Sequence, residues 1–292
     1  MFQVVYSGYT ALNLATLHSD QATVARLVAE AGVDLEAASN YTSSPLFNAA
    51  SRGDLAMVRL LVQAGARLEA RAGRDGAQLT PLIAATASGE PAVVEFLLSR
   101  GAELEAADDQ GYTAAGVAVS LGSSEMLQLL GEAGADLSRL QGRGEEAVSL
   151  AGLAASREEG ESVELLQHLV TRRVGVDQET ALGNTPLFIA ALNGNTAAAA
   201  VLLGAGADLD HRNKAGATPL LAAVFKGHTA TALLLINRGA GVNFRTEEGK
   251  DAAFFATLAS WTLDTTCVVY STATAANDTN IFQITKYFYM FD

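Results

Sequence analysis

The sequence predicts an all-α solenoid of stacked helix-turn-helix units with β-turn fingers between them. Three observations support this prediction. A phrase of the Thr-Pro-Leu type opens block after block, and each block closes on a glycine, mostly in steps of 33 residues. Four of the five prolines occupy the same place in a block. A period in this range is typical of stacked supersecondary units.

The opening phrases and closing glycines define the blocks. The openings begin at Thr10, Ser44, Thr80, Thr113, Thr185 and Thr218, and the closing glycines are Gly32, Gly65, Gly101, Gly134, Gly206 and Gly239. Between Gly134 and Gly206 the step is 72 residues, and Arg173 stands where a further closing glycine is expected.

Each block is expected to hold two helices. In residues 76–106, Thr80 suits a helix N-cap and Pro81 the first helical position. Pro91 can start a second helix, whose apolar residues recur at a spacing of three to four. Gly101 ends it, at a place where a left-handed backbone is common.

This pattern resembles the ankyrin-repeat family, whose repeats open on Gly-x-Thr-Pro-Leu and end on Gly-Ala; residues 216–240 match almost throughout. The resemblance covers residues 8 to about 258, about seven to eight tandem repeats. It implies an ankyrin-repeat solenoid over residues 1–260 and a non-repeat tail over 261–292. The expected repeats lie near 8–37, 38–70, 71–106, 107–138, 139–177, 178–210 and 211–244, with a partial repeat at 245–260.

Two departures from the family pattern stand out. The histidine after Pro-Leu, which normally supports the turn, is absent, and its place is taken by Asn13, Phe47, Ile83, Gly116, Phe188 and Leu221. Local rigidity is therefore in question. The fifth repeat opens on residues 144–148 without threonine or proline, and six extra residues around 156–161 predict a long mobile turn between its helices. Arg173 costs roughly 1 kcal/mol if its backbone is left-handed.

One leucine per repeat is expected in the core, and its truncation to alanine should cost about 2–5 kcal/mol. These leucines are Leu61, Leu97, Leu130, Leu169, Leu202 and Leu235. Because stability in repeat proteins is roughly a sum over neighbours, the irregular fifth repeat is the expected point of fracture.

Composition limits the function and location. The net charge of −13 argues against nucleic acid or an anionic membrane as the main partner. No run of eighteen apolar residues indicates a membrane span, and residues 1–7 do not resemble a secretory signal. The single cysteine, Cys267, fits a reducing, intracellular and most simply cytoplasmic location. A monomer is expected.

Acidic residues recur just after the closing glycines and predict a ladder at the base of the fingers: Asp34, Glu36, Glu69, Glu103, Glu105, Asp136, Asp208 and Asp210. Ordinary surface charge explains such a ladder. Four of these acids stand where the family usually has asparagine, which instead favours a basic partner. Both interpretations stay open.

The two ends lack repeat character. The abrupt start suggests a fragment. The tail is rich in threonine and aromatic residues, and it fits a packed extension, a sticky tail or sequence foreign to the original protein. Removing residues 265–292 is expected to leave the array folded.

No catalytic, metal or cofactor site is predicted. The four histidines are spread over three repeats, and neither zinc-ligand spacing nor a phosphate-binding loop is present. The chain is therefore not expected to be an enzyme and is expected to need no cofactor.

Binding is the remaining class of function. The resemblance implies a partner on the concave face formed by the fingers and inner helices. The candidate residues there are Tyr9, Leu17, Arg52, Tyr112, Leu121, Leu153, Asn184, Leu192, Asn193, Phe225 and Lys226. Leu153, Leu192 and Phe225 are expected to form an exposed row, unless the leucines pack between neighbouring helices.

The function expected is that of a non-catalytic protein-protein interaction scaffold, whose partner offers a basic or apolar docking segment. The alternative is the substrate-recruiting arm of a larger signalling or ubiquitin-ligase protein, present here as a fragment.

Overall fold

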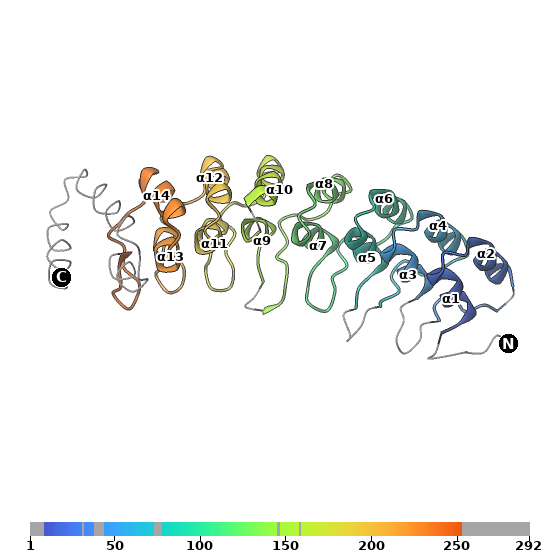
Figure 1. The fold of residues 1–292 in the computed structure, drawn as a ribbon. Coiled ribbons are helices and arrows are strands. Elements are labelled where there is room, and N and C mark those ends of the chain that lie inside the picture. The colour runs from blue at the N-terminus through green and yellow to red at the C-terminus, as the bar shows by residue number, and fades with distance from the viewer. Residues whose placement is uncertain are drawn as a thin grey trace. The chain divides into compact units, whose positions relative to one another are not determined.

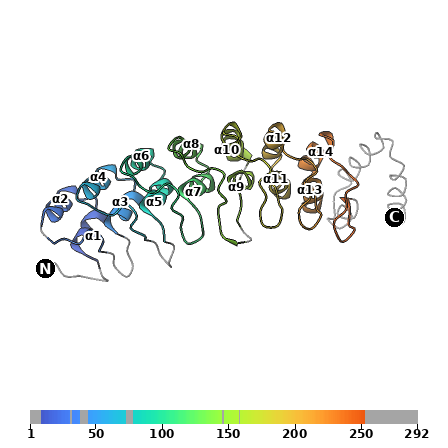
Figure 2. The same cartoon turned by 180° about the vertical axis from the view of Figure 1, so that it is seen from behind.

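The computed structural model describes residues 9–30, 32–37, 44–72, 78–144, 147–157 and 159–252. The chain divides into two compact units, residues 1–143 (unit 1) and 144–292 (unit 2). In each unit the odd-numbered helices lie on the side of the fingers and the even-numbered helices behind them (Figures 1 and 2). Among the described residues none of the helices is long and apolar enough to cross a membrane.

The described part of unit 1 contains four helix pairs, each with an inner helix next to the fingers and an outer helix behind it. These are α1 (Ala11–Leu17) with α2 (Gln21–Ala29), α3 (Pro45–Ser51) with α4 (Leu55–Gln63), α5 (Pro81–Ser88) with α6 (Pro91–Ser99), and α7 (Ala114–Ser120) with α8 (Ser124–Glu132).

The described part of unit 2 contains three such pairs. These are α9 (Leu150–Ala155) with α10 (Glu159–Thr171), α11 (Pro186–Asn193) with α12 (Thr196–Gly204), and α13 (Pro219–Lys226) with α14 (Thr229–Asn237). Helix α11 packs between α9 and α13, as α3 packs between α1 and α5 in unit 1. The all-α class is confirmed, and the predicted tail over 261–292 lies outside the described residues.

The repeated phrase works as a helix start in every regular repeat. The side chain of each opening threonine or serine accepts a hydrogen bond from the backbone N–H three residues further on, as Thr80 does from Ile83. The closing glycines all have a left-handed φ, between 87° and 99°. Arg173 adopts the same conformation, with φ 57°, so its predicted place is confirmed.

The core prediction is confirmed as well. Each of the six leucines is at most 1% exposed to solvent. The place of the missing histidine is occupied in three ways, and in the first repeat the fully buried Asn13 fills it and accepts from the Thr10 hydroxyl. Apolar side chains fill it in most repeats, and Phe47, Ile83, Phe188 and Leu221 are at most 9% exposed. Packing therefore takes over the role of the histidine hydrogen bonds.

In the fourth repeat a glycine stands in this place because another side chain enters from the next repeat. Gln141 is fully buried, and its Oε1 accepts from the backbone N–H of Thr113 at 2.9 Å and from its hydroxyl at 3.1 Å. A Cβ at Gly116 would lie only 2.3 Å from that oxygen. The amide of Gln141 thus holds the N-cap of α7, and only glycine leaves it room.

The predicted register of the fifth repeat is wrong by three residues. Its first helix, α9, is capped by Ser149 and not at position 146, so three of the extra residues precede the helix. The predicted long turn is also wrong, because residues 159–162 are helical. Helix α10 has 13 residues, whereas the other outer helices have nine. The remaining extra residues lengthen a helix, which removes the reason to expect unusual mobility there.

The fingers are held together by backbone hydrogen bonds. The N–H of Gly142 donates to the carbonyl of Gly111 at 3.3 Å in unit 1, and the N–H of Lys214 donates to that of Leu182 at 3.1 Å in unit 2. Within a finger, a polar side chain fixes the turn: Asn213 Oδ1 accepts from two backbone N–H groups. The fingers therefore present their side chains from fixed positions.

Candidate functional site

The acids at the asparagine position link neighbouring repeats. In unit 1 the carboxylates of Glu36, Glu69 and Glu105 accept hydrogen bonds from the backbone N–H groups of Arg67, Glu103 and Asp136, at 2.7, 2.8 and 2.8 Å. In unit 2 Asp177 and Asp210 accept from Asp208 and Gly241, at 3.0 and 2.9 Å. We call these five contacts the carboxylate bridges.

The bridges change how the acidic ladder is interpreted. A carboxylate oxygen that accepts a backbone N–H of the next repeat has a structural role, so the acids at this position no longer indicate a basic partner. The acids at the earlier position act locally: Asp136 Oδ1 accepts from the hydroxyl and the N–H of Ser138 at 2.6 and 3.0 Å. The Ser138 hydroxyl holds the pKa of Asp136 below its ordinary value.

In the first two repeats, Tyr9 and Leu17 are half-buried, and Leu17 ends α1. The exposed Arg52 donates from its guanidinium to the carbonyl of Leu17, so it links the first repeat to the second.

In the fourth repeat, Tyr112 is half-buried in a finger, and its N–H donates to Asp108 at 2.8 Å. Leu121, at the end of α7, is 51% exposed and is the one large apolar side chain of these candidates in unit 1 that solvent reaches freely.

In unit 2 the predicted row is wrong at one end. Leu192 and Phe225 each lie seven residues after their N-caps, on the adjacent helices α11 and α13. The equivalent residue of the fifth repeat is Ser156, because α9 is capped by Ser149. Leu153 lies one helical turn earlier and is half-buried. Leu192 is half-buried, and Phe225 is 51% exposed.

The polar residues predicted around this row differ in whether hydrogen bonds within the scaffold already use their side chains. Asn193 Nδ2 donates to the carbonyl of Ile189 at 2.9 Å, and Asn184 Oδ1 accepts from Asn213 Nδ2 at 2.8 Å. Both asparagines therefore stabilise the scaffold. Lys226 is exposed, and its Nζ lies 5.5 Å from the centre of the Phe225 ring. Its ammonium group remains available to a partner.

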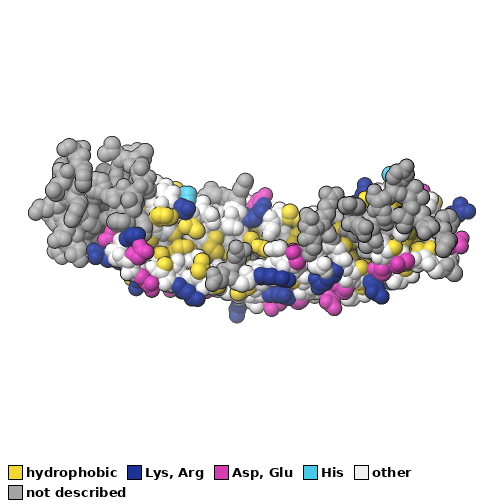
Figure 3. All heavy atoms as spheres, turned by 90° about the horizontal axis from the view of Figure 1, so that it is seen from below, with side chains coloured by type: hydrophobic (Ala, Val, Ile, Leu, Met, Phe, Trp, Pro, Cys, Tyr) yellow, Lys and Arg dark blue, Asp and Glu magenta, His cyan; other side chains and the backbone are white. Residues whose placement is uncertain are grey.

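Two exposed large apolar residues were not predicted, and one of them, Leu14 on α1, is 38% exposed. The other, Leu182 in the finger of the sixth repeat, is 53% exposed. The equivalent residues of other fingers are Gln110, Ala215 and Glu248, so a leucine at this turn was the available signal. We call Leu182, Leu192 and Phe225 the apolar patch. Figure 3 shows hydrophobic side chains gathered over the part of unit 2 that carries α11 and α13.

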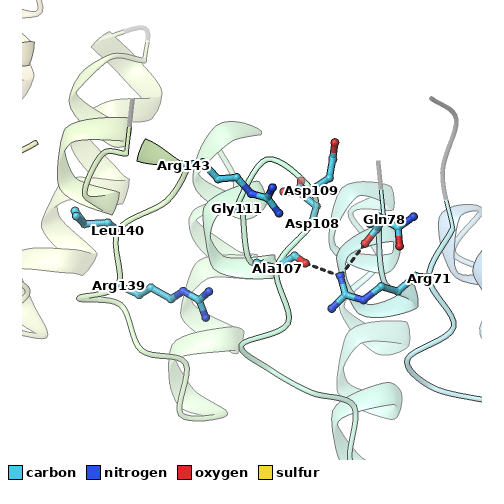
Figure 4. A pocket seen from close by; sticks show the side chains of 10 residues that line it. Arg71, Gln78, Ala107, Asp108, Asp109, Gly111, Arg139, Leu140 and Arg143 are labelled. Atoms are coloured by element: carbon cyan, nitrogen blue, oxygen red, sulfur yellow. Dashed lines mark hydrogen bonds between the residues drawn. The ribbon is translucent and has the colours of Figure 1, made fainter. Parts of the chain in front are cut away.

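Unit 1 has a different feature, a polar hollow of about 560 Å³ between the fingers of its third to fifth repeats. Its lining includes Arg71, Arg139 and Arg143, together with Asp108 and Asp109 (Figure 4). Three arginines thus line one hollow in a chain whose net charge is −13.

Family models match most of the repeat array. The model for ankyrin repeats in three copies matches residues 69–140 and 152–246, which is more than half of the chain, and the single ankyrin repeat model matches residues 43–72. The chain belongs to the ankyrin-repeat family. The break in the match, residues 141–151, coincides with the irregular start of the fifth ankyrin repeat.

A solved ankyrin-repeat structure supports the fold. The ankyrin repeat domain of human ASB11 is 28% identical to this chain and superimposes with a TM-score of 0.63. The match covers 73% of this chain and 91% of that domain. No curated protein matches the chain.

Ankyrin repeats are generally protein-protein interaction modules without catalytic activity. Two of the four histidines lie against carbonyl groups of the preceding repeat: His228 Nε2 is 3.1 Å from the carbonyl of Leu192, and His211 Nε2 is 3.1 Å from that of Gly183. Within the described ranges, no three His, Cys, Asp or Glu side chains gather as they would around a metal ion.

Proposed function

We propose that this chain is a non-catalytic scaffold that binds another protein through the fingers and inner helices of its sixth and seventh repeats. The observation behind the proposal is the apolar patch. Leu182 and Phe225 are each more than half exposed, on a scaffold whose other apolar side chains are mostly buried. Exposed apolar groups that gather on one surface are typical of interaction sites.

The residues of the patch suit a binding anchor. An aromatic ring loses few rotamers when it is buried, and aromatic residues are frequent among the side chains that dominate binding energy. Phe225 offers such a ring, and Leu192 lies on the adjacent inner helix, at the same distance from its N-cap.

The charge around the patch indicates the chemistry of the partner. Lys226 lies beside Phe225. Lys214 lies on the next finger, where its backbone N–H donates to the carbonyl of Leu182. Both lysines are exposed. We therefore propose an apolar docking segment flanked by carboxylates. A basic segment has less support, since the acids once assigned to it form the carboxylate bridges.

The test is a binding measurement with the partner that co-purifies with the wild-type chain. The double variant Leu192→Ser/Phe225→Ser should bind more weakly by about 2–4 kcal/mol, as expected for hot-spot residues. The single variant Phe225→Ser should show a smaller loss, and because this side chain is half exposed, its helical circular dichroism should equal that of wild type.

Leu121→Ser is the matched control, since it removes an equally exposed apolar side chain from unit 1. Binding by the Phe225→Ser variant at wild-type strength would show that the surface is assigned wrongly. Unfolding of the double variant alone would show that Leu192 belongs to the core, and Phe225 would then be the only anchor.

A second candidate function is that of a substrate-recruiting arm in a larger signalling or ubiquitin-ligase protein. The observation that favours it is the similarity to a structure described as the ankyrin repeat domain of human ASB11. Coding sequence for a further domain beside this one in the same transcript would support it. The single cysteine also leads us to propose an intracellular location.

A further inference from the structure

We propose that unit 1 carries a separate site, in which Arg71, Arg139 and Arg143 bind an oxyanion on a peptide segment, either a phosphorylated side chain or side-chain carboxylates. The site lies in the hollow between the fingers of the third to fifth repeats. It shares no residue with the apolar patch and does not depend on the function proposed for that patch.

The guanidinium groups are partly fixed before any ligand binds. Arg71 Nη1 donates to the carbonyls of Gln78 at 3.1 Å and Ala107 at 2.7 Å, as the dashed lines of Figure 4 show. Arg139 Nη1 donates to the carbonyl of Glu105 at 2.9 Å. These contacts use one terminal nitrogen of each fork, and the other N–H groups donate to no other described residue, which leaves them for a ligand. A fixed fork loses less entropy when it binds.

The backbone contact of Arg71 has a structural counterpart in unit 2. Arg212 donates to the carbonyls of Gly216 at 3.2 Å and Arg245 at 2.9 Å, and so joins its own finger to the next one in the same way. The finger contact alone therefore does not indicate a binding site. What is particular to unit 1 is that Arg139 and Arg143 are added to the same hollow.

Arg143 has the clearest binding role. It is exposed, and no hydrogen bond or ion pair joins its side chain to another of the described residues. Figure 4 shows its guanidinium beside Gly111 and Asp108. The position is defined by the backbone, because the N–H of Gly142 donates to the carbonyl of Gly111 and a Cβ at Gly111 would lie 2.5 Å from the Gly142 oxygen.

The carboxylates around the hollow keep their negative charge, but within the described residues no ion pair joins Asp108 or Asp109 to the three arginines. Asp108 Oδ1 already accepts from the N–H groups of Gln110 and Tyr112, and Asp109 Oδ2 accepts from the side-chain amide of Gln110. Glu105 lies 3.6 Å from Arg139 and remains its neighbour. The aspartates therefore leave the free N–H groups of the forks unoccupied, and guanidinium forks match phosphate and carboxylate oxygens.

The size of the hollow favours a peptide over a free ion. About 560 Å³ exceeds the volume of one phosphate group, so it leaves room for the segment that carries it. Asp109 at the rim offers an acceptor for a backbone N–H of that segment. An acceptor beside three cationic groups suits an anionic side chain on a neutral main chain.

The experiment uses the full chain and three degenerate peptide libraries, with phosphoserine, glutamate or serine fixed at the central position. Wild type should enrich the phosphoserine or the glutamate library over serine. For the best peptide, Arg143→Glu should lower affinity roughly tenfold to a hundredfold. Arg26→Glu, an equal change of charge at an exposed position of α2, is the matched control and should leave affinity within about twofold.

Enrichment of phosphoserine alone would identify a phosphorylated partner, and equal enrichment of glutamate would identify carboxylates. Both results support the site. Equal retention of all three libraries at low ionic strength would overturn it, as would an Arg143→Glu variant that binds like wild type. Phe225→Ser should have no effect on these peptides.

Discussion

Unit 1 bridges its repeats with glutamates, whereas unit 2 bridges them with aspartates. Glu36, Glu69 and Glu105 do in the first unit what Asp177 and Asp210 do in the second: each accepts the backbone N–H of the following repeat. The length of the side chain differs, but the partner and the bond length are alike. The comparison shows that either carboxylate can form the bridge.

The surfaces of the two units differ far more than their interiors do. Unit 1 places three arginines around a polar hollow between fingers, and unit 2 exposes an apolar patch. Both have buried leucines and hydroxyl-capped helices in the same repeat positions. Surface side chains contribute little to the buried core, so they can vary and each unit can suit a different binding partner.

The series of bridges changes at the fourth repeat. The residue at the bridging position is Ser138, and its hydroxyl donates to Asp136 of its own repeat at 2.6 Å. The division into units falls shortly afterwards, at Arg143 and Gly144. We therefore expect each unit to unfold as its own cooperative block.

Core truncations give the largest expected effect. Leu130→Ala in unit 1 and Leu202→Ala in unit 2 remove fully buried side chains and should each cost about 2–5 kcal/mol. If the units unfold separately, each variant lowers the denaturation midpoint of its own unit. Hydrogen exchange measured by mass spectrometry along a denaturant series would assign the transitions. One shared transition that moves in both variants would show that the repeats unfold as a single block.

Glycine-to-alanine substitutions should change the free energy of unfolding in opposite directions in the two units. Gly116→Ala places a Cβ 2.3 Å from Gln141 Oε1, so the buried amide must leave Thr113; we expect a loss of about 1–3 kcal/mol. Gly204→Ala, at the end of α12, meets no atom within 4 Å and should gain up to about 1 kcal/mol. Thermal denaturation measures both effects. A Gly116→Ala variant as stable as wild type would show that the Gln141 side chain can adopt another position without cost.

The regular repeats could be predicted because their signals are local. A threonine before proline favours a helix start, and a closing glycine favours a left-handed backbone. Both features are found where the sequence predicts them. Arg173 could be assigned the left-handed conformation from period alone. In the fifth repeat the N-cap is Ser149, which is followed by leucine. Gly144, further upstream, resembles the glycine that opens the usual Gly-x-Thr-Pro-Leu motif. The register was therefore misjudged by three residues, which moved Leu153 into a row to which Ser156 belongs.

The contacts between repeats could not be predicted, because their partners are about 30 residues apart. Nothing local shows that Glu69 accepts from Glu103 or that Gln141 enters the space above Gly116. For the same reason the hollow was missed, since its arginines come from different fingers. The exposure of Leu182 has no local signal either, because leucine at this turn is unusual only beside Gln110, Ala215 and Glu248 of the other fingers.

The smallest expected effect concerns the carboxylate bridges themselves. Glu69→Ala removes the acceptor of the Glu103 N–H, and Asp210→Ala removes that of Gly241; each should cost about 0.5–1.5 kcal/mol. Glu69→Gln and Asp210→Asn keep an oxygen in the same place and should cost less than half as much, because an amide oxygen still accepts the bond. Chemical denaturation of the four variants gives these values.

Glu95→Ala provides the baseline, since it removes an exposed carboxylate of α6 that bridges nothing among the described residues. If the bridges act through the hydrogen bond, the amide variants stay near this baseline in both units. If they act through negative charge, glutamine and alanine become equally destabilising at position 69. An alanine loss confined to one unit would show that the two bridge types are unequal, because a flexible glutamate loses more side-chain entropy than an aspartate when it is held in place.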